Sequence, residues 1–124
     1  MDSETLLLRQ IHPSFVQDGR PTSQAFRPTP KDECLLSVED GSKIQPRDSW
    51  ERFIIGPDCR SAGVMAVSNA ECSEHELPII EDGKPFPEHC SIDFSGLPKK
   101  SVEKKAKVLA KYAVQRDWLH KGTQ

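Results

Sequence analysis

The segment LLLRQIHPSFVQDGRPTSQAF, residues 6–26, combines an arginine, a histidine and several hydroxyl side chains within a run interrupted by prolines and a glycine. Arg9 can hold a phosphate or carboxylate through its planar guanidinium, and His12 can exchange a proton near neutral pH. Ser23 lies in a stretch shaped by glycine and proline and can donate a hydrogen bond to the same group. These three residues predict a site for an anion or a nucleotide, with His12 as the candidate acid or base.

The same three residues also have a purely structural interpretation. Arg9 would pair with a carboxylate from the acidic part of the chain, His12 would cap a turn, and Ser23 would bond to nearby backbone. Local hydrogen bonds of this kind are common among polar loop residues, so the pattern by itself allows both interpretations.

Residues 71–82, ECSEHELPIIED, gather carboxylates around one histidine. On a helix, Glu71, Glu74 and His75 lie close enough together for acid–base chemistry. The alternative is a solvated acidic face, because runs of charge usually face water. On the acid–base interpretation, Glu71 joins Arg9, His12 and Ser23 as a candidate catalytic residue.

Cys72 and His75, at positions i and i+3, can reach one metal ion from a single helix. His89 and Cys90 are neighbours on a predicted strand and point to opposite faces, so only one of them can join such a site. Further ligands would have to come from the other cysteines. Since the spacing matches no standard zinc module, we expect neither a metal nor another cofactor. The alternative is a metal site that includes Cys72 and His75.

Charge is distributed unevenly along the chain. Residues 96–124 hold eight Lys or Arg against two Asp or Glu, a balance of +6, whereas residues 1–95 hold nine against seventeen, a balance of −8. A lysine group near the C-terminus can bind nucleic acid or an acidic membrane surface, or it can be the solvated side of a packed helix. Its members are Lys99, Lys100, Lys104, Lys105, Lys107 and Lys111.

The composition is that of one small domain. Of 124 residues, 35% are hydrophobic, 29% are charged and ten are proline, which predicts a modest core and many loops. The chain has no run of eighteen apolar residues, and its acidic start is unlike a secretory signal, so we expect a cytoplasmic protein that does not bind membranes. The absence of a CxxC pair indicates reduced thiols at Cys34, Cys59, Cys72 and Cys90.

The hydrophobic pattern predicts an α+β domain covering residues 1–124, with a sheet of about four strands. Residues 1–32 are expected to be a Pro-rich, irregular segment packed on the domain, although TLLLRQI within it can form a strand or a helical turn. Phe15, Val16 and Phe26 are expected to pin this segment to the core. We expect strands near residues 34–40, 62–68, 77–83 and 89–96, and helices near 47–54, 69–76 and 99–120.

Two of these elements carry side-chain patterns that can be checked. The helix near 47–54 is expected to place Trp50, Phe53 and Ile54 on one buried face. The strand beginning at residue 89 alternates, with one face formed by Cys90, Ile92 and Phe94 and the other by His89, Ser91 and Asp93.

The motifs Arg-x-Ile-His-Pro, Ser-x-Ala-Phe and Leu-Ser-Val occur in that order, followed by FPEHCSIDFSG and a lysine-rich end. This order resembles a family of small bacterial proteins to which no reaction is assigned. The resemblance implies a bacterial origin and a cytosolic setting, and it carries no site residue.

An arginine at the end of an N-terminal apolar segment also resembles the start of ADP-ribosyltransferase-type folds. In those folds an Arg or His, a central hydroxyl and a late Glu bind and activate a dinucleotide. That resemblance implies such roles for Arg9, His12 and Ser23, with Glu71 or Glu88 as the acidic residue.

Three classes of function follow from these patterns. Because the chain has no motif with a defined mechanism, the main hypothesis is a non-catalytic partner that recognises another protein through its acidic part or its Pro-rich segment. The first alternative is an enzyme or sensor of a nucleotide or phosphorylated ligand bound by Arg9, His12 and Ser23. The second alternative is a nucleic-acid binder that uses the lysine-rich helix.

Overall fold

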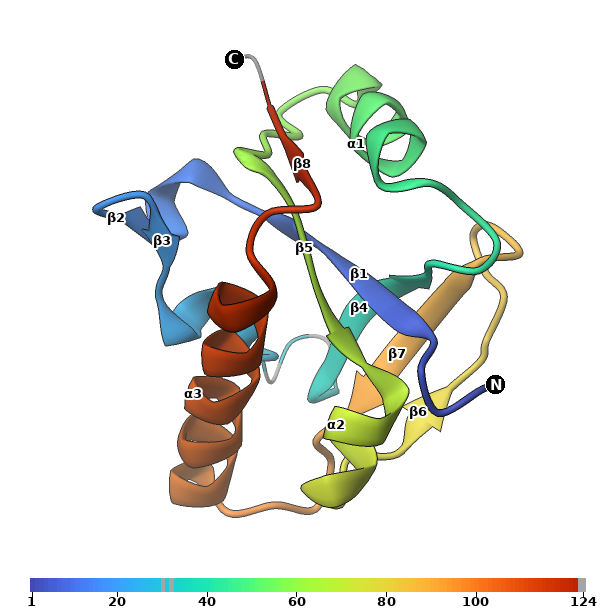
Figure 1. Ribbon diagram of the computed structural model, residues 1–124. Coiled ribbons are helices and arrows are strands. Elements are labelled where there is room, and N and C mark those ends of the chain that lie inside the picture. The colour runs from blue at the N-terminus through green and yellow to red at the C-terminus, as the bar shows by residue number, and fades with distance from the viewer. Residues whose placement is uncertain (30, 32, 123–124) are drawn as a thin grey trace.

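A six-stranded antiparallel sheet forms the centre of the computed structural model, which describes residues 1–29, 31 and 33–122 (Figure 1). The α+β class predicted from the sequence is confirmed, and the sheet is larger than the four strands expected. The order across the sheet is β6 (Ile79–Ile80), β7 (His89–Asp93), β4 (Leu35–Asp40), β1 (Leu6–Ile11), β5 (Gly63–Ser68) and β8 (His120–Lys121). A separate ribbon pairs β2 (Val16–Gln17) with β3 (Arg20–Pro21).

One face of the sheet carries most of the apolar core and packs against helix α3 (Lys99–Arg116). Ala106, Leu109 and Ala113 of α3 are fully buried, which confirms the helical spacing read from the sequence. Burying a large apolar side chain contributes roughly 1.5–3 kcal/mol, so this layer is the main source of stability. The strands supply alternate residues to it: Leu7, Ile11, Leu36, Val38, Met65, Val67, Cys90 and Ile92.

The opposite face is covered over only part of its width. Helix α1 (Pro46–Ile55) packs there against β1, β5 and β8, and its Trp50 joins a small cluster with Leu8, Val64 and Ala66. Over β4 and β7 the same face carries polar side chains, and Ser37 is exposed. The face therefore remains open beside α1.

Of the two forms expected for TLLLRQI, a strand or a helical turn, the chain adopts the strand, and this part of residues 1–32 is therefore not irregular. β1 pairs with β4 on one side and with β5 on the other, so residues 6–11 lie in the middle of the sheet. The rest of the N-terminal segment matches the expectation better: it consists of the β2–β3 ribbon and two short turns, η1 (Pro13–Phe15) and η2 (Ser23–Phe26). Phe26 is fully buried, and Phe15 and Val16 pack against the core as predicted.

The C-terminal helix is shorter than the expected range of 99–120. It ends at Arg116, because Asp117 adopts a positive φ of 72° and reverses the chain. Trp118 then packs on the larger core and Leu119 on the smaller cluster, which carries the chain past the edge of β5 to form β8. No helix in the described part of the chain is long and apolar enough to cross a membrane.

The short helix α2 (Asn69–Glu74) begins where the sequence predicts. Ser68 is its N-cap: the Ser68 side chain accepts a hydrogen bond from the Glu71 backbone N–H, and the Glu71 carboxylate accepts one from the Ser68 backbone N–H. This reciprocal capping box defines the first turn of a helix that would otherwise be too short to be stable.

We predict that Gly63→Ala lowers stability. A Cβ atom at this position would lie 2.3 Å from the backbone oxygen of His120 and 2.9 Å from the Trp118 ring, so β8 would have to move away from β5. The expected loss is about 1–3 kcal/mol in the free energy of unfolding, measured by urea denaturation. An unchanged unfolding midpoint would contradict the close pairing of these two strands.

Candidate functional site

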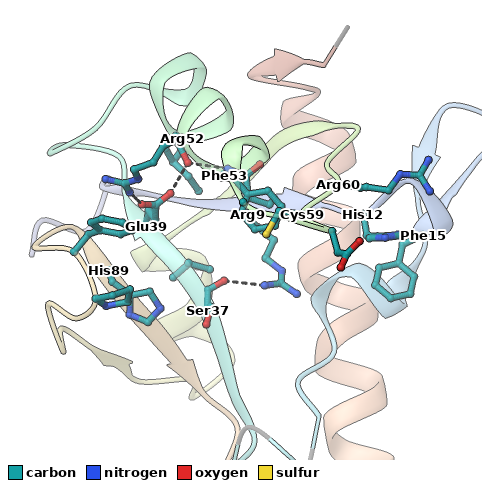
Figure 2. Close-up of a pocket in the computed structure, with 18 residues that line it drawn as sticks. Arg9, His12, Phe15, Ser37, Glu39, Arg52, Phe53, Cys59, Arg60 and His89 are labelled. Atoms are coloured by element: carbon teal, nitrogen blue, oxygen red, sulfur yellow. Dashed lines mark hydrogen bonds and ion pairs between the residues drawn. The ribbon is translucent and has the colours of Figure 1, made fainter. Parts of the chain in front are cut away.

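A pocket of about 540 Å³ opens on the uncovered part of the sheet, beside α1 (Figure 2). Its floor comes from β1, β4 and the first residue of β7. Its walls come from α1 with the loop that follows it, from the turn at residues 12–15, and from the loop at residues 85–86. In Figure 2, Arg60, His12 and Phe15 lie towards one end, Arg52, Glu39 and His89 towards the other, and Arg9 between them.

Arg9 is held where two strands separate. The pairing of β1 with β4 is confined to Leu7↔Asp40 and Leu8↔Glu39. Just beyond it, Arg9 Nε donates to the Ala25 carbonyl oxygen at 2.9 Å and Nη1 donates to the Ser37 carbonyl oxygen at 3.0 Å. The guanidinium thus ties β1 to β4 and to η2, and Arg9 is one of the residues that line the pocket.

His12 is also held by local bonds. Its Nδ1 accepts a hydrogen bond from the Ser14 backbone N–H at 3.0 Å and lies 2.7 Å from the Ser14 hydroxyl, so the side chain caps η1 as the structural interpretation predicts. An accepting Nδ1 assigns the proton of the neutral ring to Nε2. In that tautomer, Nε2 is an N–H donor on a residue that lines the pocket.

Arg60 is a pocket cation that the sequence reading missed. It lies in the loop after α1, together with Asp58 and Cys59, and its side chain is exposed. The loop turns tightly, with the Cys59 backbone N–H bonded to the Gly56 carbonyl oxygen at 3.1 Å. Among the residues that the structure describes, none forms an ion pair with Arg60.

A chain of hydrogen bonds runs beneath α1 to the far end of the pocket. Ser61 donates to the Gln10 side-chain oxygen at 2.8 Å, and the Gln10 amide donates to the Ser49 hydroxyl, also at 2.8 Å. Ser49 donates in turn to Glu39, which is ion-paired with Arg52. These bonds pair polar side chains in the layer between α1 and the sheet, which in a closed core would be filled by apolar side chains.

Arg52 is neutralised by two carboxylates and is therefore a wall of the pocket rather than an available cation. Its guanidinium pairs with Glu39 and with Glu88, and it lies 3.8 Å from the centroid of the Phe86 ring. Burial raises the pKa of Glu88, but the hydrogen bond and the charge of Arg52 outweigh it, so that the pKa is lowered. The Arg52 pairing thus keeps the Glu88 carboxylate ionised at neutral pH.

Two phenylalanines of the pocket are exposed. Phe53 on α1 is 37% exposed and Phe86 is 43% exposed. Trp50 and Ile54 do pack on the sheet, as the sequence indicates, whereas Phe53 turns towards the pocket instead of the core. Helical periodicity places Phe53 on the same side of α1 as Trp50. The apolar cluster between α1 and the sheet does not extend as far as Phe53, so its side chain borders the pocket.

The structure brings together two of the predicted site residues. Arg9 and His12 line the same pocket, while Ser23 lies in η2 outside the lining. Glu71 is on α2, where Arg116 binds its carboxylate at 2.9 and 3.2 Å. The grouping implied by the ADP-ribosyltransferase resemblance is therefore not assembled around Glu71, and its other acidic candidate, Glu88, is paired with Arg52 at the pocket wall.

The two Cys–His pairs considered as metal ligands, Cys72 with His75 and His89 with Cys90, are not brought together at one site. Cys72 is fully buried, and burial raises the pKa of its thiol to about 12. His75 Nε2 lies 3.1 Å from the Tyr112 hydroxyl. Within the described residues, no group of three or more His, Cys, Asp or Glu is placed to hold a metal ion. The predicted alternation is confirmed at His89, which lines the pocket, and Cys90, which is buried in the core.

The lysines of the C-terminal helix lie away from this pocket. Lys105 donates to the His75 carbonyl oxygen, and the other five are exposed. This is the arrangement expected of the solvated side of a packed helix, and nucleic-acid binding by these lysines stays a prediction.

No protein-family model, no curated protein sequence and no solved structure matches the chain. The geometry of the pocket is therefore the basis for any functional conclusion.

Glu71 gives a pH prediction for stability. Burial raises its pKa, but the Arg116 hydrogen bond, the Ser68 backbone N–H and the charge of Arg116 together lower it below 4.5. A carboxylate with a lowered pKa stabilises the fold above the pKa of the unfolded chain, and this contribution is lost as the pH falls through the folded-state pKa. We expect Glu71→Gln to cost about 1–2 kcal/mol at pH 7 and much less below pH 4, measured by denaturation across pH.

Glu81→Gln is the matched control, since Glu81 is exposed and belongs to none of the described ion pairs. If the loss in free energy of unfolding varied with pH in the same way for the two variants, the role assigned to the Arg116–Glu71 pair would be contradicted.

Proposed function

We propose that this protein binds a small organic anion, carrying a phosphate or carboxylate group, in the pocket beside α1. The observation that carries the proposal is the convergence of Arg9, His12 and Arg60 on one cavity from three separate segments. Planar guanidinium groups and a neutral imidazole N–H suit the oxygens of such an anion.

The size and shape of the pocket support the same proposal. About 540 Å³ falls within the roughly 300–1,000 Å³ typical of small-molecule sites. The Arg9 and His12 side chains are held by backbone groups, so little side-chain freedom would be lost when an anion binds. If the bound molecule is turned over, His12 is the group placed to transfer a proton.

The exposed apolar residue Ile55 favours a protein partner as a second candidate. Ile55 is 81% exposed at the end of α1 and is not part of the pocket lining. Phe53 on the same helix and Phe86 in the loop before β7 are exposed as well, and exposed apolar side chains of this kind can be covered by a partner's surface. On this candidate, Ile55→Ser reduces partner capture and leaves small-anion binding intact, which separates it from the first.

We predict that Arg60→Ala weakens binding of ribose 5-phosphate at least about tenfold, because a hydrogen bond to a charged group contributes about 1.5–3 kcal/mol. His12→Asn should weaken it as well: the Asn oxygen can still accept from the Ser14 backbone N–H, but the Nε2 donor is gone. Isothermal titration calorimetry measures both effects.

Arg47→Ala is the control, since Arg47 is an exposed arginine on α1 that does not line the pocket and pairs with Glu51. Native mass spectrometry of freshly purified protein should also show a bound anionic molecule that Arg60→Ala loses. The proposal fails if the unmodified protein carries no adduct and binds neither phosphorylated nor carboxylated probes.

A further inference from the structure

We infer that the molecule bound in this pocket carries a flat aromatic ring joined to its anionic group, with the ring against Phe53 and Phe86. This inference rests on the proposed function and specifies the chemical class of the ligand.

Phenylalanine is distributed between only two places in this protein. The chain has five, of which Phe26 and Phe94 are fully buried in the core. The remaining three, Phe15, Phe53 and Phe86, all line the pocket, although they come from η1, from α1 and from the loop before β7. Every phenylalanine outside the fully buried set therefore contributes to this one cavity.

The ring of Phe86 is held in place without being covered. The Arg52 guanidinium lies 3.8 Å from its centroid, and Arg52 is anchored in turn by Glu39 and Glu88. Phe86 nevertheless remains 43% exposed. A positioned, exposed ring is ready to pack against another flat ring, which gains from both burial and ring–ring electrostatics.

The Phe86 ring and the arginine without a described ion-pair partner lie at different ends of the pocket. Arg52 is compensated by its two carboxylates, whereas Arg60 has no described ion-pair partner and lies near His12 at the other end (Figure 2). An anion bound at the Arg60 end would leave the Phe86 end for a different part of the ligand. A ligand that satisfies both ends has one charged part and one apolar, flat part.

An anion alone would leave most of the pocket volume unfilled. An inorganic phosphate occupies a few times the roughly 30 Å³ of a water molecule, a small part of about 540 Å³. A phosphorylated polyol would fill more of the space, but its hydroxyl groups would be desolvated against Phe53 and Phe86. An aromatic ring fills the same space at no such cost.

The test compares phenyl phosphate with glycerol 3-phosphate, which have similar size and carry the same anionic group. Calorimetry should give about two- to tenfold tighter binding for phenyl phosphate. Adenosine monophosphate against ribose 5-phosphate repeats the comparison with a larger ring. Phe53→Leu and Phe86→Leu should each lower the preference for the aromatic member of the pair, whereas Ile80→Ala, at an exposed apolar residue outside the pocket, should not.

The possible results separate the two proposals. Equal affinity for phenyl phosphate and glycerol 3-phosphate overturns the aromatic inference and leaves anion binding in place. A preference that neither Phe variant lowers also overturns it, because the ring then binds elsewhere. If no member of either pair binds, and neither inorganic phosphate nor the carboxylated probe benzoate binds, the proposed function itself fails.

Discussion

The sheet has two faces, and the unequal distribution of apolar residues between them decides where the remaining elements lie. Only about a third of the residues are hydrophobic, and most of the large ones fill the layer between the sheet and α3. The opposite face has a small apolar cluster under α1 and polar residues over β4 and β7. A sheet face without apolar side chains gains little from being covered, so it stays open.

Polar interactions replace the missing part of the core. The hydrogen-bonded series from Ser61 to Glu39, continued by the Arg52 ion pairs, joins α1 to the sheet and to the loop before β7. Such groups must all be satisfied, because an unpaired polar group or charge in a partly buried position costs more than its pairing contributes. The network therefore holds α1 at one orientation and gives the pocket a rigid wall.

The same arrangement accounts for the two kinds of surface inside the pocket. Arg52 serves the network and is not available as a cation, whereas Arg60 lies in the loop beyond the end of α1 and has no described ion-pair partner. Phe86 lies on the side of the network, where the Arg52 guanidinium packs against its ring. Anion binding and aromatic packing are thus proposed for opposite ends because one arginine is neutralised and the other is not.

Local sequence signals determined the elements that depend on neighbouring residues. The strand at 35–40, the alternation of β7, the capping box of α2 and the apolar stripe of α3 all follow from side-chain periodicity and capping, and all are present. Arg9 and His12, which the sequence places close together in one segment, both line the pocket.

Tertiary structure decided the rest, since it depends on which segments meet. β1 became a central strand because β4 and β5 pair with its two sides, and α3 ended at Arg116 because the chain reverses at Asp117 to reach the edge of β5. Arg60, Phe53 and Phe86 entered the pocket through the sheet order and the partial cover by α1, although nothing near them in the sequence marks them as neighbours. Periodicity describes a residue relative to its own helix or strand, and a pocket forms where several elements leave a surface uncovered.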